Sequence, residues 1–374
     1  MRERALRVLI CGAGIAGPAS AALLGRSGHR VVVVERDQGV RSSGNPVDAR
    51  GAAFDVVEDL GVLPRLREAA TSVRELAFVD AAGERVAAIG TRRSRDRELE
   101  VGRADLSAAL VEAGRSEADY RFGDTVADIR PDGDGAEVTF ERSPAERFDL
   151  VVGADGVHSR IRRLAFGPEA DFVRPLGMYI ATVRIPEVGH RGDTVLMHNA
   201  PGAATALHPG TDSPGAAFMF RSARQIDPGD PAASRDELQR VYGSLGWRVP
   251  ELLASYLAAD DTYFDAVCRV RTPTWSRGPV TLLGDAASCV SLFGDGSTAA
   301  VVGARTLASA LATAGDLPTA LARYETQHRR FVARGQRAVP VVSRLLIPAT
   351  RTGIELRNAA LRVAGLVPFA RRDV

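Results

Sequence analysis

The sequence predicts an α/β fold in which a parallel sheet carries an inserted antiparallel β-sheet and is followed by a C-terminal helical segment. Three observations predict it. Apolar runs at 8–10 and 31–34 flank a glycine-rich turn and an Ala- and Leu-rich stretch, the pattern of strand, helix and strand. Four β-rich runs between 176 and 223 are separated by Pro and Gly with no helix among them, which is typical of antiparallel pairing. Helix-forming stretches at 297–314 and 318–339 follow a last apolar strand.

The glycine-rich turn has the spacing of a dinucleotide-binding site. Gly12 permits the tight turn, Gly14 lets a diphosphate approach the backbone, and Gly17 lets the helix pack closely on the strand. The helix that follows would point its unpaired N–H groups and its positive dipole end at the phosphates. Glu35 ends the second strand, where its carboxylate can accept hydrogen bonds from the ribose hydroxyls. The first part of the chain is therefore predicted to be a Rossmann-type domain.

Length and composition limit the classes of function that the chain can have. A chain of 374 residues exceeds the usual limit of one hydrophobic core, so two domains are expected. A net charge of +2 favours neither nucleic acid nor a membrane surface as a partner. All 48 basic residues are arginine, which excludes Schiff-base chemistry on a lysine. The cysteines Cys11, Cys268 and Cys289 have no metal-ligand spacing and make a poor disulfide framework. We therefore expect a cytoplasmic protein without a signal peptide, a membrane span or a metal site.

The remaining elements of the first domain follow in order. The segment 47–66 is predicted to form a helix that ends near Gly61, and 76–89 a β-hairpin. The charged run 91–100 is interpreted as a solvated connection. A helix should begin at about 101, and strands are expected at 124–130, 136–141 and 148–152.

The second half contains the inserted sheet and the return to the first domain. Helices are predicted at 235–242 and 250–259, and the strand-like run 263–270 is expected to lead back to the first domain, where 280–283 forms a further strand. The arginine-rich tail from 341 is broken by Pro348 and Pro368. The predicted domains are 1–175 (with a small hairpin insertion at 73–95), 176–267, 268–340 and a helical tail at 341–374.

Three separated motifs carry a family resemblance. They are the glycine-rich turn at 12–17, the run Asp155-Gly156-x-x-Ser159-x-x-Arg162 and the pair Gly284-Asp285. In this order and at this spacing the set resembles the FAD-dependent aromatic hydroxylases, the class A flavoprotein monooxygenases with the para-hydroxybenzoate hydroxylase fold. The resemblance spans nearly the whole chain.

The resemblance implies a set of residues that bind FAD without a covalent bond. Asp285 would bind the ribityl chain, and the helix after it would point its N-terminus at the flavin, where reduction places negative charge. Asp155 would serve FAD and the nicotinamide cofactor; the alternative is a turn residue that caps the following helix, and the two roles can coexist. Arg103 would meet the phosphate or ribityl region, Arg50 the flavin, and Arg36 the adenosine. The full expected set is Gly12, Gly14, Ala16, Gly17, Glu35, Arg36, Arg50, Arg103, Asp155, Asp285, Gly294 and Gly296.

The loop after Gly284-Asp285 departs from the family pattern. Gly294 and Gly296 are kept, but Val290 stands near the usual proline and Asp295 adds a carboxylate beside the expected flavin edge. This departure puts the oxygen chemistry in doubt more than FAD binding. Asp295 could cap the helix at 297–314, or its charge could lower the flavin potential.

The inserted sheet is expected to roof the substrate pocket. Tyr179, His208, Phe218 and Phe220 are the candidates for its lining, because alternation places the two phenylalanines on one face. The six histidines show no metal-ligand or nucleophile–base pairing, and no catalytic side chain is assigned.

The function implied by the resemblance is a monooxygenase. NADPH or NADH would reduce FAD, dioxygen would form the C4a-hydroperoxide, and an electron-rich aromatic or polyketide-like molecule would be hydroxylated or epoxidised. Two alternatives stay open: a non-oxygenating FAD enzyme (reductase, dehydrogenase or cyclase) and a non-catalytic FAD-binding scaffold. A single glycine-rich turn disfavours oxygenases with two Rossmann domains, and the lack of lysine disfavours flavin halogenases. The protein is expected to be a monomer or homodimer.

Overall fold

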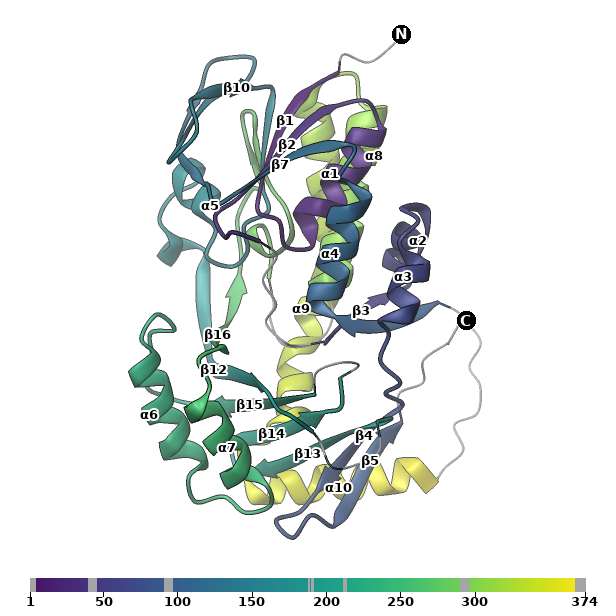
Figure 1. Cartoon of the computed structure of the whole chain (residues 1–374), viewed down its shortest axis with the longest axis vertical. Coiled ribbons are helices and arrows are strands. Elements are labelled where there is room, and N and C mark those ends of the chain that lie inside the picture. Colours follow the sequence, from purple (N-terminus) through teal and green to yellow (C-terminus); the bar gives the residue numbers. More distant parts are fainter. Residues whose placement is uncertain are drawn as a thin grey trace.

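The structure is a computed structural model that describes residues 5–39, 46–90, 97–187, 189, 192–210, 214–289 and 296–366. Its upper half is a six-stranded sheet with helices α1, α4 and α8 on one face, and its lower half is a larger antiparallel sheet (Figure 1). These halves correspond to the Rossmann-type domain and the inserted β-sheet that the sequence predicts. The predicted fold class is therefore confirmed.

The six-stranded sheet is the Rossmann-type part. Its central strand β1 pairs in parallel with β2 and β11, and both β1 and β2 are buried along nearly their whole length. Burial on both faces explains why these strands are continuous apolar runs. In order across the sheet the strands are β17 (Ser276–Arg277), β18 (Val280–Leu282), β11 (Leu150–Gly153), β1 (Arg7–Cys11), β2 (Arg30–Glu35) and β7 (Ala118–Phe122). The helices are α1 (Ala16–Arg26), α4 (Arg103–Ala113) and α8 (Gly296–Thr313).

A small antiparallel sheet lies beside the six-stranded one. It consists of β8 (Val126–Pro131), β9 (Ala136–Phe140) and β10 (Glu146–Phe148). Phe140 and Phe148 pack edge to face with ring centroids 6.3 Å apart, and both belong to the core of the Rossmann-type part. The strands predicted at 124–130 and 136–141 are thus found within two residues of their predicted ends.

The segment at 46–68 corrects the sequence prediction of one helix. Residues Pro46–Arg50 form strand β3, which pairs antiparallel with β6 (Glu98–Gly102), and helices α2 (Ala52–Asp59) and α3 (Leu63–Glu68) follow. Gly51 separates strand from helix with a φ of 54°. The partner strand β6 begins within the run 91–100 that was interpreted as a solvated connection, so that interpretation is wrong for 98–100. Pairing between segments this far apart overrides local helix propensity.

The large sheet has seven strands. Their order is β16 (Thr262–Val270), β12 (Val173–Arg184), β15 (Gly215–Arg221), β14 (Ala203–His208), β13 (Thr194–Ala200), β4 (Glu75–Val79) and β5 (Arg85–Gly90). The predicted hairpin is β4–β5, and it extends this sheet through parallel pairing of β4 with β13. Strand β16 is the edge strand paired along β12, and the chain passes from it to β17 of the six-stranded sheet.

The two faces of this sheet are covered differently. Helices α6 (Pro231–Tyr242) and α7 (Val249–Ala258) pack on the outer face with a core that contains Phe218, Phe220 and Tyr242. The inner face, part of which is turned toward the Rossmann-type part, carries Met178, Met197 and Met219. The sheet therefore separates an aromatic core from a methionine-rich face.

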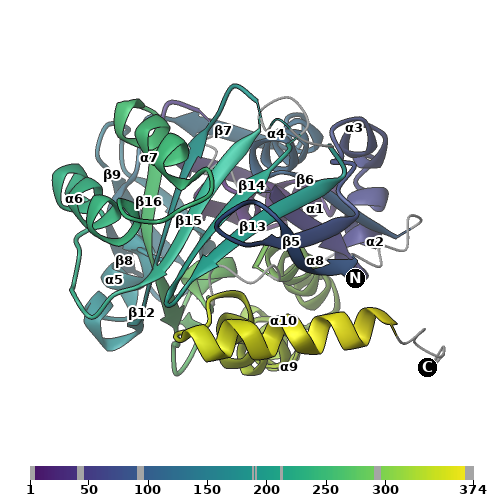
Figure 2. The ribbon, with the colours of Figure 1, turned by 90° about the horizontal axis from the view of Figure 1, so that it is seen from below.

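Of the two C-terminal helices, α9 (Leu317–Leu346) connects the halves and α10 (Arg351–Leu366) packs on the large sheet. Helix α9 runs from the Rossmann-type part down to the large sheet, and α10 lies across β5 and β13 (Figures 1 and 2). The guanidinium of Arg357 lies 3.7 Å from the centroid of the Phe78 ring and donates to Asn199 Oδ1 at 2.9 Å. These contacts fix the tail to the hairpin and the sheet.

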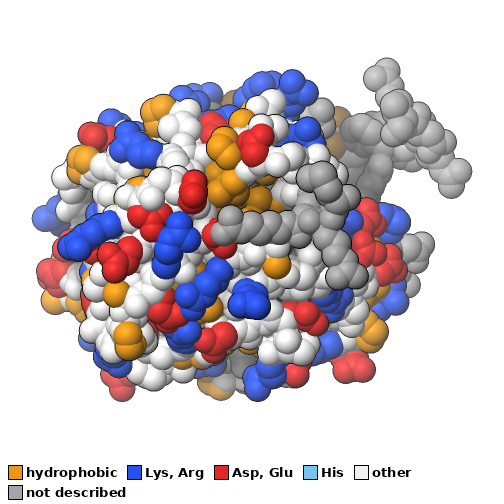
Figure 3. Space-filling model, turned by 90° about the horizontal axis from the view of Figure 1, so that it is seen from above, with side chains coloured by type: hydrophobic (Ala, Val, Ile, Leu, Met, Phe, Trp, Pro, Cys, Tyr) orange, Lys and Arg blue, Asp and Glu red, His pale blue; other side chains and the backbone are white. Residues whose placement is uncertain are grey.

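The surface carries charges of both signs. On the face seen from above, arginine side chains alternate with Asp and Glu and no large area of one sign is visible (Figure 3). In the part of the chain that is described, none of the helices has the length and apolarity needed to cross a membrane.

A buried histidine on α9 makes stability depend on pH. His328 is 3% exposed, lies among Trp275, Tyr324 and Phe331, and burial lowers its pKa to about 4. Between pH 6.5 and 4 the unfolded chain binds a proton that the folded chain does not, so the free energy of unfolding should fall by about 3 kcal/mol over this window. Urea unfolding at several pH values measures it. His328→Gln should flatten the dependence, and an unchanged slope in this variant would assign the effect to other groups.

Candidate active site

A cleft of about 610 Å³ lies between the two halves. It is lined by the glycine-rich turn, the end of β2, the start of β3, the start of α4, the turn after β11, the segment around Asp285, the start of α8 and the inner face of the large sheet. Most of the residues that the sequence assigned to the cofactor therefore line one continuous cavity.

The three glycines of the turn differ in the space around them. A Cβ on Gly12, whose φ is 109°, would lie 2.5 Å from the Ala154 carbonyl oxygen, and a Cβ on Gly17 would lie 1.9 Å from the Gly12 carbonyl oxygen. Any side chain at these two positions would force the turn apart. By contrast, nothing lies within 4 Å of a Cβ on Gly14. The backbone at Gly14 is thus open toward the cleft, while Gly12 and Gly17 are held by close packing.

Side chains from two other elements hold this turn. Ser107 on α4, which is buried, donates to the carbonyl oxygens of Ala13 at 3.1 Å and Gly14 at 2.6 Å. Glu35 accepts from the backbone N–H of Ala13 at 2.7 Å and of Asp37 at 3.0 Å. Glu35 thus positions the turn, besides lining the cleft where ribose hydroxyls were expected. Sequence reasoning missed Ser107, because no motif marks it.

The residues present fit the diphosphate of a dinucleotide. No side chain caps the N-terminus of α1, and its first turn carries no acidic residue. The first N–H groups of that helix therefore face the cleft without a side-chain acceptor, beside the open backbone of Gly14. Such an end binds an anion without further cationic residues.

Asp155 has the capping role that was the alternative to cofactor binding. It accepts from the Ser159 hydroxyl at 2.5 Å and from the backbone N–H groups of Arg160 at 2.7 Å and Ile161 at 3.0 Å. Ser159 in turn caps helix α5 (Arg160–Ala165) by accepting from the Arg162 N–H at 2.9 Å. Burial raises the pKa of Asp155, although these donors oppose the shift. Asp155 also lines the cleft, so its capping role is compatible with a contact to a bound cofactor.

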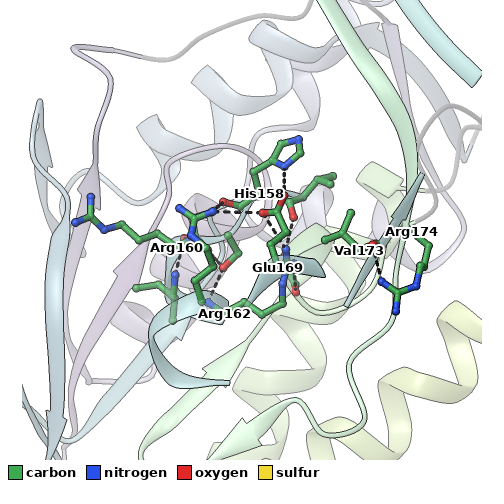
Figure 4. Close-up of polar contacts among 12 residues, drawn as sticks. His158, Arg160, Arg162, Glu169, Val173 and Arg174 are labelled. Carbon is green, nitrogen blue, oxygen red and sulfur yellow. Dashed lines mark hydrogen bonds and ion pairs between the residues drawn. The ribbon is translucent and has the colours of Figure 1, made fainter. Parts of the chain in front are cut away.

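Arg162 joins two of the three sequence motifs. Its side chain is fully buried and donates to the Ala286 carbonyl oxygen at 3.0 Å and to the Val157 carbonyl oxygen at 2.5 Å, with Glu169 at 3.7 Å (Figure 4). Ala286 directly follows Asp285 in the 3₁₀ turn Gly284–Ala286. The conformation of the Asp285 segment therefore depends on an arginine more than a hundred residues earlier.

Asp285 lies at the start of α8. Its Oδ1 atom is 3.8 Å from the position of a Cβ on Gly296, and both residues line the cleft. Burial, with the nearby Asp285 carboxylate, raises the pKa of the Cys289 thiol, which makes this cysteine an inert buried group. On the same side, the hydroxyls of Ser297 and Thr298 donate to the Asp48 carbonyl oxygen at 2.9 and 3.0 Å, which ties α8 to β3.

The three predicted cofactor arginines differ in position. Arg103 begins α4 and lines the cleft. Arg36 also lines it, with a side chain that is 77% exposed. Arg50 is the last residue of β3. Its side chain is exposed, and it is not among the described residues that line the cleft. The structure thus brings Arg36 and Arg103 to the site and leaves Arg50 outside it.

The substrate candidates require a correction. Tyr179, Phe218 and Phe220 lie in the outer core under α6 and α7, where the Tyr179 hydroxyl donates to the Arg224 carbonyl oxygen at 3.1 Å. His208 does not line the cleft either, and its Nε2 atom lies 3.1 Å from Glu100 Oε1. Alternation correctly separates the two faces of β15, but it does not tell which one the helices cover. The cleft wall is the opposite face and contains Ile180, Ala217, Met219, Tyr263 and Asp265.

A polar cluster joins this wall to the turn after β11. Tyr263 donates to Asp265 Oδ2 at 3.0 Å, and Asp265 lies 3.7 Å from His158 Nε2. His158 also contacts Glu169 at 2.9 Å, as Figure 4 shows. The carboxylates of Asp265 and Glu169 raise the pKa of His158 to about 9, so this histidine is a cation at neutral pH. Arg160, which is paired with Glu141, lines the cleft beside it, so this rim carries two cations, each with a carboxylate partner.

Some predicted features lie outside the described residues. These are Gly294, Val290 and Asp295, so the departure from the family pattern in this loop stays a sequence observation. Within the described segments, no group of three or more His, Cys, Asp or Glu residues is arranged to hold a metal ion.

Comparison with known proteins decides the family. The profile of the FAD binding domain family matches residues 5–338. The chain belongs to this family. The match extends over both halves of the structure and includes all three motifs, so the resemblance to FAD-dependent hydroxylases that the sequence predicts is confirmed.

Individual relatives agree with this assignment. An uncharacterised protein of Mycobacterium tuberculosis is 39% identical over 346 residues, which cover 88% of this chain and 91% of the relative. A flavin-dependent monooxygenase of Legionella longbeachae is 32% identical and covers 89% of this chain and 87% of its own. The crystal structure of the tetracycline destructase Tet(55) is 30% identical, with a TM-score of 0.84 and coverage of 97% and 96%.

Proposed function

We propose that this FAD-dependent monooxygenase hydroxylates an electron-rich aromatic or polyketide-like small molecule, with NADPH or NADH as reductant and dioxygen as the source of the inserted oxygen. The observation that carries the proposal is the continuous cleft, which runs from the dinucleotide-type turn to the inner face of the large sheet. In the balanced reaction, one oxygen atom enters the substrate and the other leaves as water, while the nicotinamide is oxidised.

The chain would position the reactants rather than carry the redox chemistry. Bound FAD supplies dioxygen activation and the transfer of one oxygen atom. The N-terminus of α1 would provide N–H donors to the diphosphate, and Asp285 would offer a carboxylate to hydroxyl groups of the cofactor. The buried wall of the large sheet excludes water from the substrate side, which protects an oxidising centre from side reactions.

The cleft wall supports an aromatic or polycyclic substrate. Ile180, Ala217 and Met219 offer an apolar, adaptable surface, and the paired Tyr263 and Asp265 offer one polar contact beside it. The likeness to a protein named as a tetracycline destructase, at 30% identity, supports a substrate of several fused rings. We therefore expect flat, phenol-bearing molecules to stimulate reductant consumption.

The two cations on this rim, His158 and Arg160, support docking of the reduced nicotinamide cofactor. His158 and Arg160 line the cleft beside Asp155, and the phosphates of NADPH or NADH would meet their positive charges. Since the pKa of His158 is raised to about 9, the rim loses one charge above this pH. The KM for the reductant should rise by up to about fivefold between pH 8 and 10, the effect of one exposed ion pair. Steady-state kinetics measure it. In His158→Gln this pH dependence should vanish, and a wild-type KM profile in the variant would place the cofactor elsewhere.

Isotope labelling tests the reaction itself. The FAD-loaded protein is incubated with NADPH or NADH, ¹⁸O₂ and a panel of polycyclic phenols that includes tetracycline, and products are analysed by mass spectrometry. A monooxygenase yields a product that is heavier by one ¹⁸O atom. Product formation without label would favour the non-oxygenating alternative, and no turnover of any substrate together with bound FAD would favour a scaffold.

We also propose that the protein is cytoplasmic and is a monomer or homodimer. The three cysteines are buried and free, which suits a reducing compartment. Light scattering of the purified protein measures the oligomeric state.

A further inference from the structure

A second pocket, of about 240 Å³, lies between the end of α9 and the large sheet. Three arginines line it: Arg221 at the end of β15, Arg269 on β16 and Arg344 on α9. Apolar side chains of Leu176, Met178 and Val339 complete much of the wall. No Asp or Glu is among the described residues that line it.

No acidic residue in the described part of the chain forms an ion pair with these arginines. Arg221 donates to the carbonyl oxygens of Ser343 and Ile347, both at 3.1 Å, and so caps the C-terminus of α9 without meeting an acid. The Nε atom of half-buried Arg269 has no hydrogen-bond partner, and no ion pair joins Arg269 or Arg344 to another described residue. Burial, with the positive charge of Arg344, lowers the pKa of Arg221. Half-buried Arg221 and Arg269 and exposed Arg344 thus line one small cavity, with no counter-charge among the described residues.

This arrangement is costly for the protein alone. Cations that converge on one cavity repel each other, and a buried N–H without an acceptor loses its hydrogen bond to water. A bound anion would remove both costs. The guanidinium group is a planar fork of donors that matches carboxylate and phosphate oxygens. The apolar walls provide a place for a small hydrophobic body attached to the anion.

We propose that this pocket binds a small organic acid, with its carboxylate or phosphate group on Arg269 and Arg344 and its apolar part against Met178 and Val339. Its walls continue the inner face of the sheet: Met178 lies two residues from Ile180 on β12, and Arg221 two residues from Met219 on β15. Two residues of strand span roughly 7 Å. The acid is therefore either a group on the substrate of the neighbouring cleft or a separate small molecule. Only the first of these sources rests on the proposed function.

Calorimetric titration of the FAD-loaded protein tests the site. The probes are benzoate, its neutral isostere benzamide, and inorganic phosphate. Benzoate should bind, and benzamide should not, because recognition depends on the negative charge. Phosphate should bind more weakly than benzoate, because it lacks the apolar part. In Arg269→Gln and in Arg344→Gln the Kd for benzoate should rise at least tenfold.

Arg330→Gln is the matched control. Arg330 is exposed on the same helix and does not line the pocket, so its loss should leave benzoate binding unchanged. Without ligand, the Tm of Arg269→Gln should equal or exceed that of the wild type, since an unpaired charge is removed. Benzoate binding that survives both pocket variants, equal binding of benzamide, or a clear fall in the Tm of Arg269→Gln would overturn the proposal.

Inhibition kinetics distinguish the two sources of the acid. Benzoate that competes with the hydroxylated substrate identifies the pocket as a subsite for an acidic group on that substrate. Inhibition or activation that is not competitive identifies a separate small acid. The titrations themselves need neither reductant nor dioxygen, so failure of the proposed hydroxylation would leave their expected result unchanged.

Discussion

Gly17→Ala is expected to lower the affinity for FAD at least tenfold and to reduce the free energy of unfolding by about 1–3 kcal/mol. The new Cβ would lie 1.9 Å from the Gly12 carbonyl oxygen, so either the start of α1 or the turn must move. Both carry the N–H groups that would face the diphosphate. Fluorescence titration with FAD and thermal unfolding of the FAD-free protein measure the two effects.

Two further glycine variants separate packing from binding. Gly14 has open space at its Cβ position, so Gly14→Ala should keep the wild-type Tm without FAD and still bind FAD more weakly. Gly315 has equal space but lies between α8 and α9, and Gly315→Ala should change neither quantity. If Gly14→Ala bound FAD as the wild type does, the diphosphate would not lie over this turn.

Arg162→Met is expected to reduce the free energy of unfolding by about 2–5 kcal/mol. It leaves the Ala286 and Val157 carbonyl oxygens, both bonded to a fully buried guanidinium, without their donors, at about 1–3 kcal/mol each. Because Ala286 follows Asp285, FAD binding should weaken as well. Urea unfolding and FAD titration check the two effects.

The neighbouring Arg163 provides the control. Its side chain is 46% exposed and contacts Glu169 at 3.3 Å, so Arg163→Met should cost less than about 1 kcal/mol. Equal losses in the two variants would mean that the link between the Asp155 and Asp285 motifs has no special role in stability.

The parts of the fold that depend on local sequence could be predicted. The turn with Gly12 and Gly17 has one workable geometry, because two carbonyl oxygens occupy the positions where side chains would be. The antiparallel strands could also be predicted, because the Pro and Gly residues that separate them are visible in the sequence. These features need no knowledge of distant segments.

The parts that depend on distant partners could not be predicted. Strand β3 forms because β6 pairs with it. Its own residues continue into the pattern of the following helix, so the local sequence does not mark it as a strand. Phe218 and Met219 alternate on β15, but only the position of α6 and α7 decides that Met219 faces the cleft. Arg162 is one of 48 arginines, and nothing local marks it as the buried one. Only the fold brings the carbonyl oxygens of Ala286 and Val157 together around its guanidinium.

Hydrogen exchange measured by mass spectrometry, with and without FAD, tests the location of the cofactor site most directly. We expect FAD to slow exchange in the turn at 12–17, after Asp155 and around Asp285, and to leave α6 and α7 unchanged, because those helices lie on the far face of the large sheet. Unaltered exchange at 12–17 and around Asp285 in the presence of saturating FAD would contradict the assignment of this cleft as the flavin site.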